Sequence, residues 1–382
     1  MRIPFNKPFI AGKELYYIAR AVLGGHLSGG GYYTKRCHEW LEKRLGCVRA
    51  FLTHSCTDSL EMAAVLCDIQ PGDEVIMPSF TFVSTANAFV LRGAIPVFVD
   101  IRPDTLNIDE KRIDAGVSSR SRAIVPVHYA GVGCAMEEIM AIAQRCDLLV
   151  IEDAAQGFCN AYQGRYLGTI GHLGCLSFHE TKNIITGEGG ALLVNEPRFV
   201  ERAEIIWEKG TDRSKFRRGE VDKYTWVDVG SSFSPSELIG AFLYAQLELE
   251  KEINEARSML YRRYLDLLRP LEQQGLLKLP PESATSGCIG HIFHILTQTT
   301  DERAGLISYL QKHDIQAVFH YVPLHSSPAG RKYGRTCGDM SVTNDVSERL
   351  LRLPIFYEMT GSEVMRVSET IHRFYGMPFG GV

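Results

Sequence analysis

Short apolar segments alternate with helical patterns over the first two-thirds of this 382-residue chain. The apolar segments are rich in β-branched residues on both faces, which is typical of strands buried inside a sheet. Such alternation predicts an α/β fold with a mostly parallel sheet and helices on both faces. Ligands of these sheets bind beyond the carboxyl ends of the strands. We expect seven strands, at 49–52, 74–77, 95–99, 123–127, 148–151, 175–178 and 191–194, and helices at 13–23, 35–45, 55–67, 82–92, 109–117, 136–145 and 197–208.

The pattern changes after Pro235. Residues 236–268 read as one or two long helices, and a loop rich in Pro, Ser and Gly follows at 280–287. Because a chain of this length exceeds one small core, we predict a large domain at 1–246 and a smaller α+β domain at 247–382. In the smaller domain we expect strands at 291–296 and 317–321 and helices at 302–313, 344–351 and 362–375.

The charge balance gives no electrostatic signature of a polyanionic partner. The 41 basic and 45 acidic residues leave a net charge of −4, so we expect neither nucleic acid nor a membrane as a partner. No two of the ten cysteines form a Cys-x-x-Cys pair, and we expect no metal site. The N-terminal segment lacks the apolar core of a signal peptide, and no apolar run is long enough to span a bilayer. These features favour the reducing cytoplasm.

Two strand ends carry residues with acid–base chemistry. One strand ends at Ser177 and leads to a loop that holds Lys182, followed by a glycine-rich turn at 187–190. A lysine in a crevice can lose its proton through desolvation and act as a nucleophile, although an isolated loop lysine is usually solvated. Another strand ends near Asp153, which suits a buried carboxylate facing a cationic ring nitrogen. Taken alone, a helix N-cap is the commoner role for such an aspartate.

Two further motifs offer an anion site and a stacking surface. Residues 53–58 open a helix, and their hydroxyl and backbone N–H groups would bind an anion, although N-capping explains the same residues. Phe82 lies at a strand-to-helix turn and would stack on a flat ring, although most such aromatic residues belong to a core. No Gly-x-Gly-x-x-Gly follows a strand, which argues against a dinucleotide-binding oxidoreductase.

Taken together, these motifs resemble the fold-type-I enzymes that use pyridoxal 5′-phosphate (PLP), and more narrowly the DegT/DnrJ/EryC1/StrS sugar aminotransferases. The resemblance covers almost the whole chain and rests on the blocks 152–156, 177–182 and 187–190. It implies a PLP-dependent aminotransferase in which Lys182 is the Schiff-base lysine and proton shuttle, and Asp153 pairs with the ring nitrogen. It also implies cofactor contacts to the phosphate from Thr57, Ser177 and the backbone of Cys56 and Asp58, from Phe82 to the ring and from Gln156 near the phenolic oxygen.

Two positions depart from the family pattern. Members commonly have glycine where this chain has Cys56, and an asparagine that reaches a neighbouring subunit's phosphate where this chain has Ser232. The resemblance implies a homodimer with active sites shared between subunits, in which Ser232 would take the place of the asparagine. Family members that carry out dehydration have histidine at the lysine position, so Lys182 favours transamination.

Within the family, the segments 178–183, 208–211 and 221–226 are most similar to the transaminases that make dTDP-4-amino-4,6-dideoxygalactose for enterobacterial common antigen. This similarity implies that glutamate donates an amino group to C4 of a dTDP-4-keto-6-deoxyhexose. Amination at C3, a UDP-linked sugar and a non-catalytic regulator of the same fold are the alternatives. Candidate substrate contacts are Lys209, Arg213, His320, Tyr321 and His325. The basic residues Lys209 and Arg213 could equally belong to a solvated face, and His320 could equally be a structural histidine.

Overall fold

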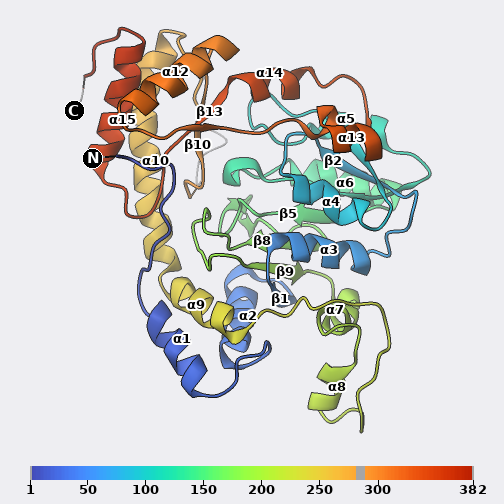
Figure 1. The fold of residues 1–382 in the computed structure, drawn as a ribbon. Coiled ribbons are helices and arrows are strands. Elements are labelled where there is room, and N and C mark those ends of the chain that lie inside the picture. Colours follow the sequence, from blue (N-terminus) through green and yellow to red (C-terminus); the bar gives the residue numbers. More distant parts are fainter. Residues whose placement is uncertain (1, 281–288, 381–382) are drawn as a thin grey trace.

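The computed structural model describes residues 2–280 and 289–380. Its central feature is an eight-stranded sheet with the order β1-β9-β8-β5-β4-β2-β3-β12 (Figure 1). Neighbouring strands run parallel except at β9, which is antiparallel to both β1 and β8. The strands are β1 (Arg49–Thr53), β2 (Glu74–Pro78), β3 (Ile95–Val99), β4 (Ser121–Ile124), β5 (Leu149–Asp153), β8 (Leu173–Ser177), β9 (Gly190–Val194) and β12 (Arg335–Thr336).

This sheet confirms the predicted mostly parallel α/β fold, but the predicted count of seven strands omitted β12. The two-residue strand pairs with β3 and comes from the C-terminal part of the chain. Its sequence is polar and short, so only its distant partner identifies it as a strand. The strand expected at 123–127 also ends early, at Ile124, and Val127 forms a single bridge with Asp153.

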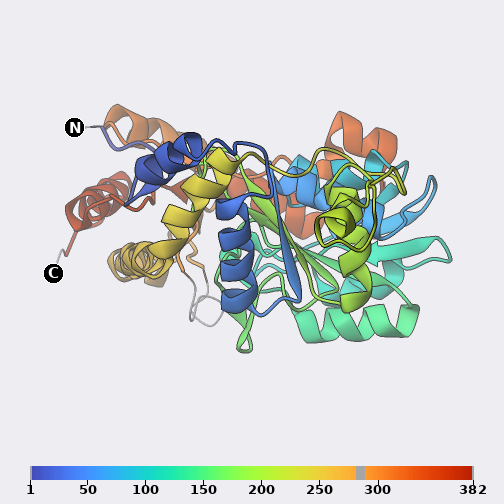
Figure 2. The same ribbon diagram turned by 90° about the horizontal axis from the view of Figure 1, so that it is seen from below.

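Helices cover both faces of the central sheet (Figure 2). This part of the chain contains α1 (Glu14–Leu23), α2 (Tyr32–Leu45), α3 (Cys56–Leu66), α4 (Val83–Val90), α5 (Glu110–Gly116), α6 (Met136–Cys146), α7 (Val200–Trp207), α8 (Arg213–Arg217), α9 (Glu237–Glu248), 3₁₀ turns at Tyr129–Gly131 and Pro197–Phe199, and a hairpin of β6 (Ala161–Tyr162) and β7 (Arg165–Tyr166). The helices α3, α4 and α7 pack into one core cluster, and α2, α6 and α9 pack into another. Strands β2, β8 and β9 are buried along their whole length, as strands between two helical layers must be.

The C-terminal part builds another core around a three-stranded antiparallel sheet with the order β10-β13-β11. Its elements are α10 (Glu250–Gln273), β10 (Phe293–Leu296), α12 (Thr300–Lys312), β11 (Val318–Phe319), a 3₁₀ turn at Leu324–Ser326, α13 (Pro328–Tyr333), α14 (Ser341–Arg349), β13 (Leu350–Leu353) and α15 (Gly361–Phe374). Tyr264, Phe293 and Val364 belong to this core, and Ile3 joins it through a bridge to Ile315. The division of the chain between residues 246 and 247 stays a prediction.

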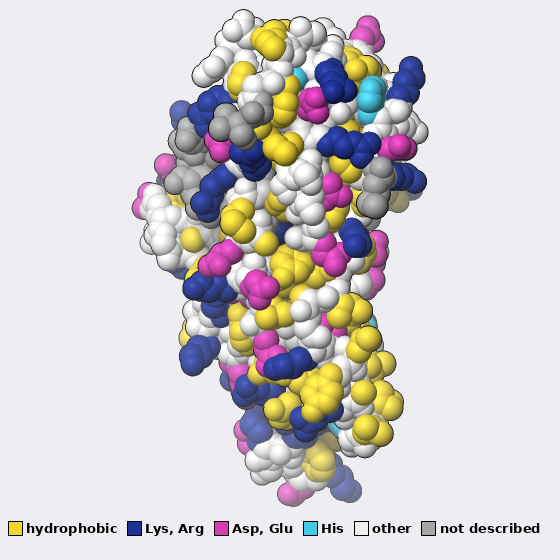
Figure 3. Space-filling view, turned by 90° about the vertical axis from the view of Figure 1, so that its left-hand side faces the viewer, with side chains coloured by type: hydrophobic (Ala, Val, Ile, Leu, Met, Phe, Trp, Pro, Cys, Tyr) yellow, Lys and Arg dark blue, Asp and Glu magenta, His cyan; other side chains and the backbone are white. Residues whose placement is uncertain are grey.

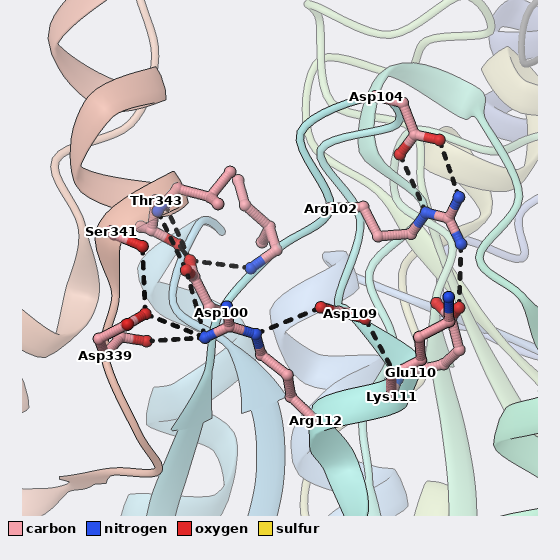
Figure 4. A network of polar contacts seen from close by, with 12 residues as sticks. Asp100, Arg102, Asp104, Asp109, Glu110, Lys111, Arg112, Asp339, Ser341 and Thr343 are labelled. Carbon is pink, nitrogen blue, oxygen red and sulfur yellow. Dashed lines mark hydrogen bonds and ion pairs between the residues drawn. The ribbon is translucent and has the colours of Figure 1, made fainter.

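Two buried carboxylates fasten the returning C-terminal chain to the central sheet. Arg335 of β12 donates to Glu74 of β2 at 2.6 Å. Asp100, directly after β3, accepts hydrogen bonds from the backbone N–H groups of Val342 and Thr343 at the start of α14, and from the Thr343 hydroxyl at 2.6 Å (Figure 4). These bonds hold the chain between β11 and β13 against the edge of the central sheet.

The helix predicted at 344–351 extends too far at its C-terminal end. The helix expected at 344–351 stops at Arg349, and Leu350 starts β13. Pairing with β10 and β11 decides this change, and no local pattern encodes that pairing.

Of the loop expected at 280–287, residues 281–287 lie outside the described residues. None of the helices in the two described ranges combines the length and the apolar character that crossing a membrane requires.

Candidate active site

A cavity of about 420 Å³ lies at the carboxyl ends of β5 and β8. Its walls come from these strand ends, from the starts of α3 and α4, and from β13 and the segment after β11. This is where α/β sheets bind their ligands. The residues predicted from the sequence that line the cavity are Cys56, Thr57, Phe82, Asp153, Gln156, Ser177, Lys182, His320 and Tyr321.

Asp153, the last residue of β5, is held in place by hydrogen-bond donors. The Thr85 hydroxyl donates to Asp153 Oδ2 at 2.7 Å, and the Ala155 backbone N–H donates to Oδ1 at 3.2 Å. Thr85 is also hydrogen-bonded to Thr81 at 2.8 Å. Asp153 is only 5% exposed, and burial raises the pKa of its carboxyl while the Thr85 hydrogen bond opposes that rise. A cationic group facing Asp153 from the cavity would offset the unfavourable burial of its charge.

Lys182 lies in a turn after β8, where its backbone N–H donates to the carbonyl of His179 at 2.9 Å. Its side chain lines the same cavity as Asp153. Burial lowers the pKa of Lys182, and the nearby Asp153 carboxylate opposes that shift. Lys182 is only partly exposed and lines the cavity, so it is not the fully solvated lysine that its loop sequence alone allows. Its neutral amine, the nucleophilic form, is more populated than in an exposed lysine.

The start of α3 lies beside Gly190, the first residue of β9. A Cβ atom on Gly190 would lie 2.5 Å from the backbone nitrogen of Cys56 and would also collide with Ser55. Only glycine lets the strand pass this close to the end of the helix. Thr57 in the first turn shares a 2.7 Å hydrogen bond with Ser84 of α4. Hydroxyl groups beside a helix N-terminus suit a phosphate.

Gln156 joins the central sheet to the segment after β11. Its Oε1 accepts from the Ala130 backbone N–H at 2.7 Å, and its Nε2 donates to the Tyr321 hydroxyl at 3.0 Å. The His320 ring stacks on Tyr321 with centroids 3.5 Å apart, and its Nδ1 lies 3.2 Å from the Tyr129 hydroxyl. Burial lowers the pKa of His320, so its imidazole is neutral at neutral pH. This wall of the cavity is aromatic and carries hydrogen-bonding groups.

Phe82 and Ser177 complete the cavity walls that the sequence predicted. Phe82 precedes α4 and is 58% exposed, so it is not one of the core aromatic residues that the sequence also allowed. Ser177 is the last residue of β8, and its hydroxyl accepts a long hydrogen bond of 3.4 Å from the backbone N–H of His179. An exposed ring and a strand-end hydroxyl remain available to a ligand.

Asp58 and His325 do not line the cavity. The Asp58 carboxylate lies 3.5 Å from His54 Nδ1, and its backbone N–H donates to the Ser55 hydroxyl that caps α3. His325 Nδ1 is hydrogen-bonded to the Ser79 hydroxyl at 2.7 Å. Both side chains thus contribute to local structure at the ends of α3 and β2.

Ser232, Lys209 and Arg213 gather around Glu208, away from the cavity. Ser232 forms a β-bridge with Glu208, and Arg213 lies 3.6 Å from the Glu208 carboxylate. Lys209 adopts a left-handed backbone conformation with φ of +65°. Within one chain, none of these three residues lines the cavity.

Arg352 and His291 line the cavity but were missed from the sequence. Arg352 lies in β13 between Leu351 and Leu353. A lone charged residue inside an apolar segment was the signal that could have found it, because such residues are rarely buried without a partner. His291 Nδ1 lies 3.0 Å from Asn183 Oδ1, and no pattern in its neighbourhood pointed to it.

The model of the DegT/DnrJ/EryC1/StrS aminotransferase family matches residues 9–372. The chain belongs to this family. As a DegT/DnrJ/EryC1/StrS protein it is an aminotransferase, and the predicted family resemblance is confirmed. The eight-stranded sheet is thus the fold of a transaminase.

Known proteins of similar sequence and structure extend over nearly the whole chain. The spore coat polysaccharide biosynthesis protein SpsC of Bacillus subtilis is 30% identical, and the match covers 97% of this chain and 96% of SpsC. A DegT DnrJ EryC1 StrS aminotransferase from Brucella abortus is 28% identical with a TM-score of 0.87, and 95% of each chain is covered. NtdA of Bacillus subtilis, solved with bound cofactor PMP, is 26% identical with a TM-score of 0.87, and the match covers 98% of this chain and 86% of NtdA.

Proposed function

We propose that this aminotransferase uses PLP to move an amino group from glutamate to C4 of dTDP-4-keto-6-deoxyglucose, giving dTDP-4-amino-4,6-dideoxygalactose. The observation that carries the proposal is that Lys182 and Asp153 line one cavity at the ends of the paired strands β8 and β5. A desolvated amine and a buried carboxylate are the two protein groups that PLP chemistry needs on either side of the ring.

The cavity offers a partner for each part of PLP. The start of α3, with Thr57 and the nearby Ser177, would hold the phosphate beside Gly190, where a Cβ atom would fill the space. Asp153 would face the ring nitrogen, and its otherwise unfavourable burial is explained by such a cation. Phe82 offers its exposed ring as a stacking surface. The residues present therefore fit this cofactor, which the structure of the related NtdA contains in its PMP form.

Lys182 and Asp153 would divide the chemistry between them. When bound, PLP supplies an aldehyde that takes up the donor's amino group and a ring that stabilises negative charge on the donor's α-carbon. Lys182 would hold the cofactor through Nζ and, once released, take the proton from that carbon as a general base. Thr85 and Ala155 keep the Asp153 carboxylate fixed, so that it can hold the proton on the ring nitrogen.

The sugar substrate is supported by sequence similarity and by the cavity wall. Segments 178–183, 208–211 and 221–226 resemble segments of the transaminases that make this amino sugar, and the related SpsC is a spore coat polysaccharide biosynthesis protein. His320 and Tyr321 offer a neutral, aromatic surface with hydrogen-bonding groups, which suits a sugar ring. Amination at C3 and a UDP-linked sugar remain the competing members of the same reaction class.

A homodimer with shared active sites would explain where the basic residues lie. Apolar side chains are exposed on the face that carries α1 (Figure 3), among them Leu15, Tyr16 and Leu23. Trp226, which forms a β-bridge with Thr211 between Lys209 and Arg213, is 78% exposed. Exposed apolar groups of this size mark interaction surfaces. In a dimer, the segment with Lys209, Arg213 and Ser232 would reach the partner's cavity and its anionic ligands.

We also place the reaction in the cytoplasm. The nine cysteines within the described ranges are all free thiols, which is the usual state in a reducing compartment. Five of them are buried, and such cysteines act as small apolar core residues.

Product analysis by NMR tests the proposed substrate. We expect incubation with glutamate and dTDP-4-keto-6-deoxyglucose to yield a sugar with the amine at C4 in the galacto configuration. An amine at C3, or turnover confined to a UDP-linked sugar, would contradict the proposal and favour its alternatives.

The Lys182→Ala variant tests the catalytic role of the amine. We expect kcat to fall by at least about 10³-fold, because positioned proton transfer contributes roughly 10²–10⁴-fold and the covalent link is lost as well. The substitution removes no core side chain, so the melting temperature of the apoprotein should stay close to that of the parent. Turnover near the parental rate in Lys182→Ala would overturn the mechanism.

A further inference from the structure

Arg352 lines the candidate active-site cavity, and no acidic side chain among the described residues pairs with it. Arg352 lies opposite His294 of β10 and Val318 of β11 in the small sheet. Its Nε is buried, and within the described ranges no hydrogen bond satisfies it. Burial lowers the pKa of Arg352, and the groups that oppose this shift are the phenols of Tyr129 and Tyr321, not carboxylates. Burial of a permanent cation without an anion is unfavourable.

The groups around Arg352 are either cationic or uncharged, so they do not offset its positive charge. Lys182 and three neutral histidines, His291, His294 and His320, all have pKa values lowered by burial and by the charge of Arg352. The ring of Phe5 lies 4.7 Å from the guanidinium carbon and provides a cation–π contact. None of these contacts neutralises the charge. The Arg352 side of the cavity is therefore suited to an anionic ligand.

The reaction would bring three kinds of anionic group to the cavity: the cofactor phosphate, the nucleotide diphosphate and the α-carboxylate of the donor. The position of Arg352 favours one of them. The hydroxyl groups suited to the cofactor phosphate come from α3 and the end of β8, whereas Arg352 comes from the small sheet. In a nucleotide sugar, the diphosphate on C1 lies across the hexose ring from the keto carbon. In an amino acid, the α-carboxylate is bonded directly to the reacting carbon. Arg352 and Lys182 line the same cavity, and the charge of Arg352 contributes to lowering the pKa of Lys182.

We propose that Arg352 binds the α-carboxylate of the amino donor, and so fixes the donor's α-carbon next to Lys182. A guanidinium presents two parallel N–H donors that match the two oxygens of a carboxylate. This inference rests on the proposed aminotransferase function and adds the residue that selects an amino-acid donor. The keto sugar has no carboxylate, so Arg352 serves one half of the reaction and not the other.

Single-turnover measurements on the holoenzyme separate the two halves. We expect Arg352→Gln to weaken the apparent affinity for glutamate at least about 30-fold in the first half-reaction, as loss of a desolvated charge pair does. The reaction of the pyridoxamine form with the keto sugar should change less than about threefold. Arg352→Lys keeps the positive charge but loses the two parallel N–H donors. Its apparent affinity for glutamate should lie between those of the parent and Arg352→Gln. The exposed Arg331→Gln on α13 is the control and should change neither half.

Donor analogues test the same contact in the unmodified enzyme. Glutamine keeps the α-carboxylate, whereas isoglutamine has that group as an amide and keeps the γ-carboxylate. We expect glutamine to react much faster than isoglutamine, and Arg352→Gln to remove most of this preference. Equal reactivity of the two analogues, or equal losses in both half-reactions of Arg352→Gln, would overturn the inference while leaving the aminotransferase function intact. A holoenzyme that converts no amino acid at all would instead refute the proposed function.

Discussion

Burial acts in opposite directions on the pKa values of Lys182 and Asp153. It lowers the pKa of the amine and raises that of the carboxyl, so burial alone drives both groups toward their neutral forms. Their mutual attraction opposes both shifts. A neutral Lys182 is the form that can attack an aldehyde or accept a proton. For Asp153, a cationic ring nitrogen would restore the charged form.

The pH dependence of PLP uptake by the apoprotein tests this arrangement. Because the pKa of Lys182 lies below the ordinary value of 10.5, the rate should rise with pH and reach half of its maximum below pH 10.5. Asp153 raises the pKa of Lys182, so the midpoint in Asp153→Asn should move to a still lower pH. Stopped-flow absorbance measures both rates. A midpoint at or above 10.5 would contradict a desolvated amine.

Among the elements, the contact between β9 and the start of α3 shapes the end of the cavity that we propose holds the cofactor phosphate. Gly190 is required there because any side chain would meet Ser55 and Cys56. We expect Gly190→Ala to lower the free energy of unfolding by roughly 1–3 kcal/mol, as overpacking does, and to weaken PLP binding. Calorimetry and cofactor titration measure the two effects.

Gly46→Ala provides a matched control for this contact. Gly46 ends α2 with φ of +83°, and a Cβ atom there would meet nothing within 4 Å. The substitution should cost about 1–2 kcal/mol of stability through backbone strain, with no change in PLP affinity. Equal losses of affinity in the two variants would show that the β9–α3 contact has no special role in the cofactor site.

The elements also show how far the sequence predicts this structure. Strands such as β3 and helices such as α15 follow from local periodicity. Asp153 at the end of β5 and Lys182 after β8 could be found because strand ends converge in such sheets. The strands β12 and β13 could not, because their pairing with β3 and with β10 and β11 is long-range. Arg352 was missed for the same reason, since its place in the cavity depends on β13.

Across the whole molecule, β12 ties the C-terminal part to the central sheet through Arg335 and Glu74. Hydrogen bonding to Arg335 is the main cause that lowers the pKa of Glu74 below its ordinary value of 4.5. The ion pair therefore stabilises the fold fully above pH 4.5, and its contribution is lost as the pH falls through the lowered pKa. Stability in acid should depend on this contact.

Urea unfolding of Arg335→Met tests the contribution of the pair. We expect a loss of about 2 kcal/mol at pH 7, less than for a fully buried pair because Arg335 is partly exposed to solvent. The difference from the parent should shrink as the pH drops below 4.5. Arg145→Met, which removes an exposed pair with Asp114, should change stability by less than about 0.5 kcal/mol at either pH. A pH-independent loss in Arg335→Met would exclude the ion pair as its cause.

Borohydride reduction of the holoenzyme, followed by mass spectrometry of its peptides, tests most directly whether PLP is joined to Lys182. We expect a phosphopyridoxyl group on the peptide that contains Lys182, on no other lysine, and absent after Lys182→Ala. A label on a different lysine, or no label on protein that absorbs in the visible range, would contradict the assignment of this cavity as the active site.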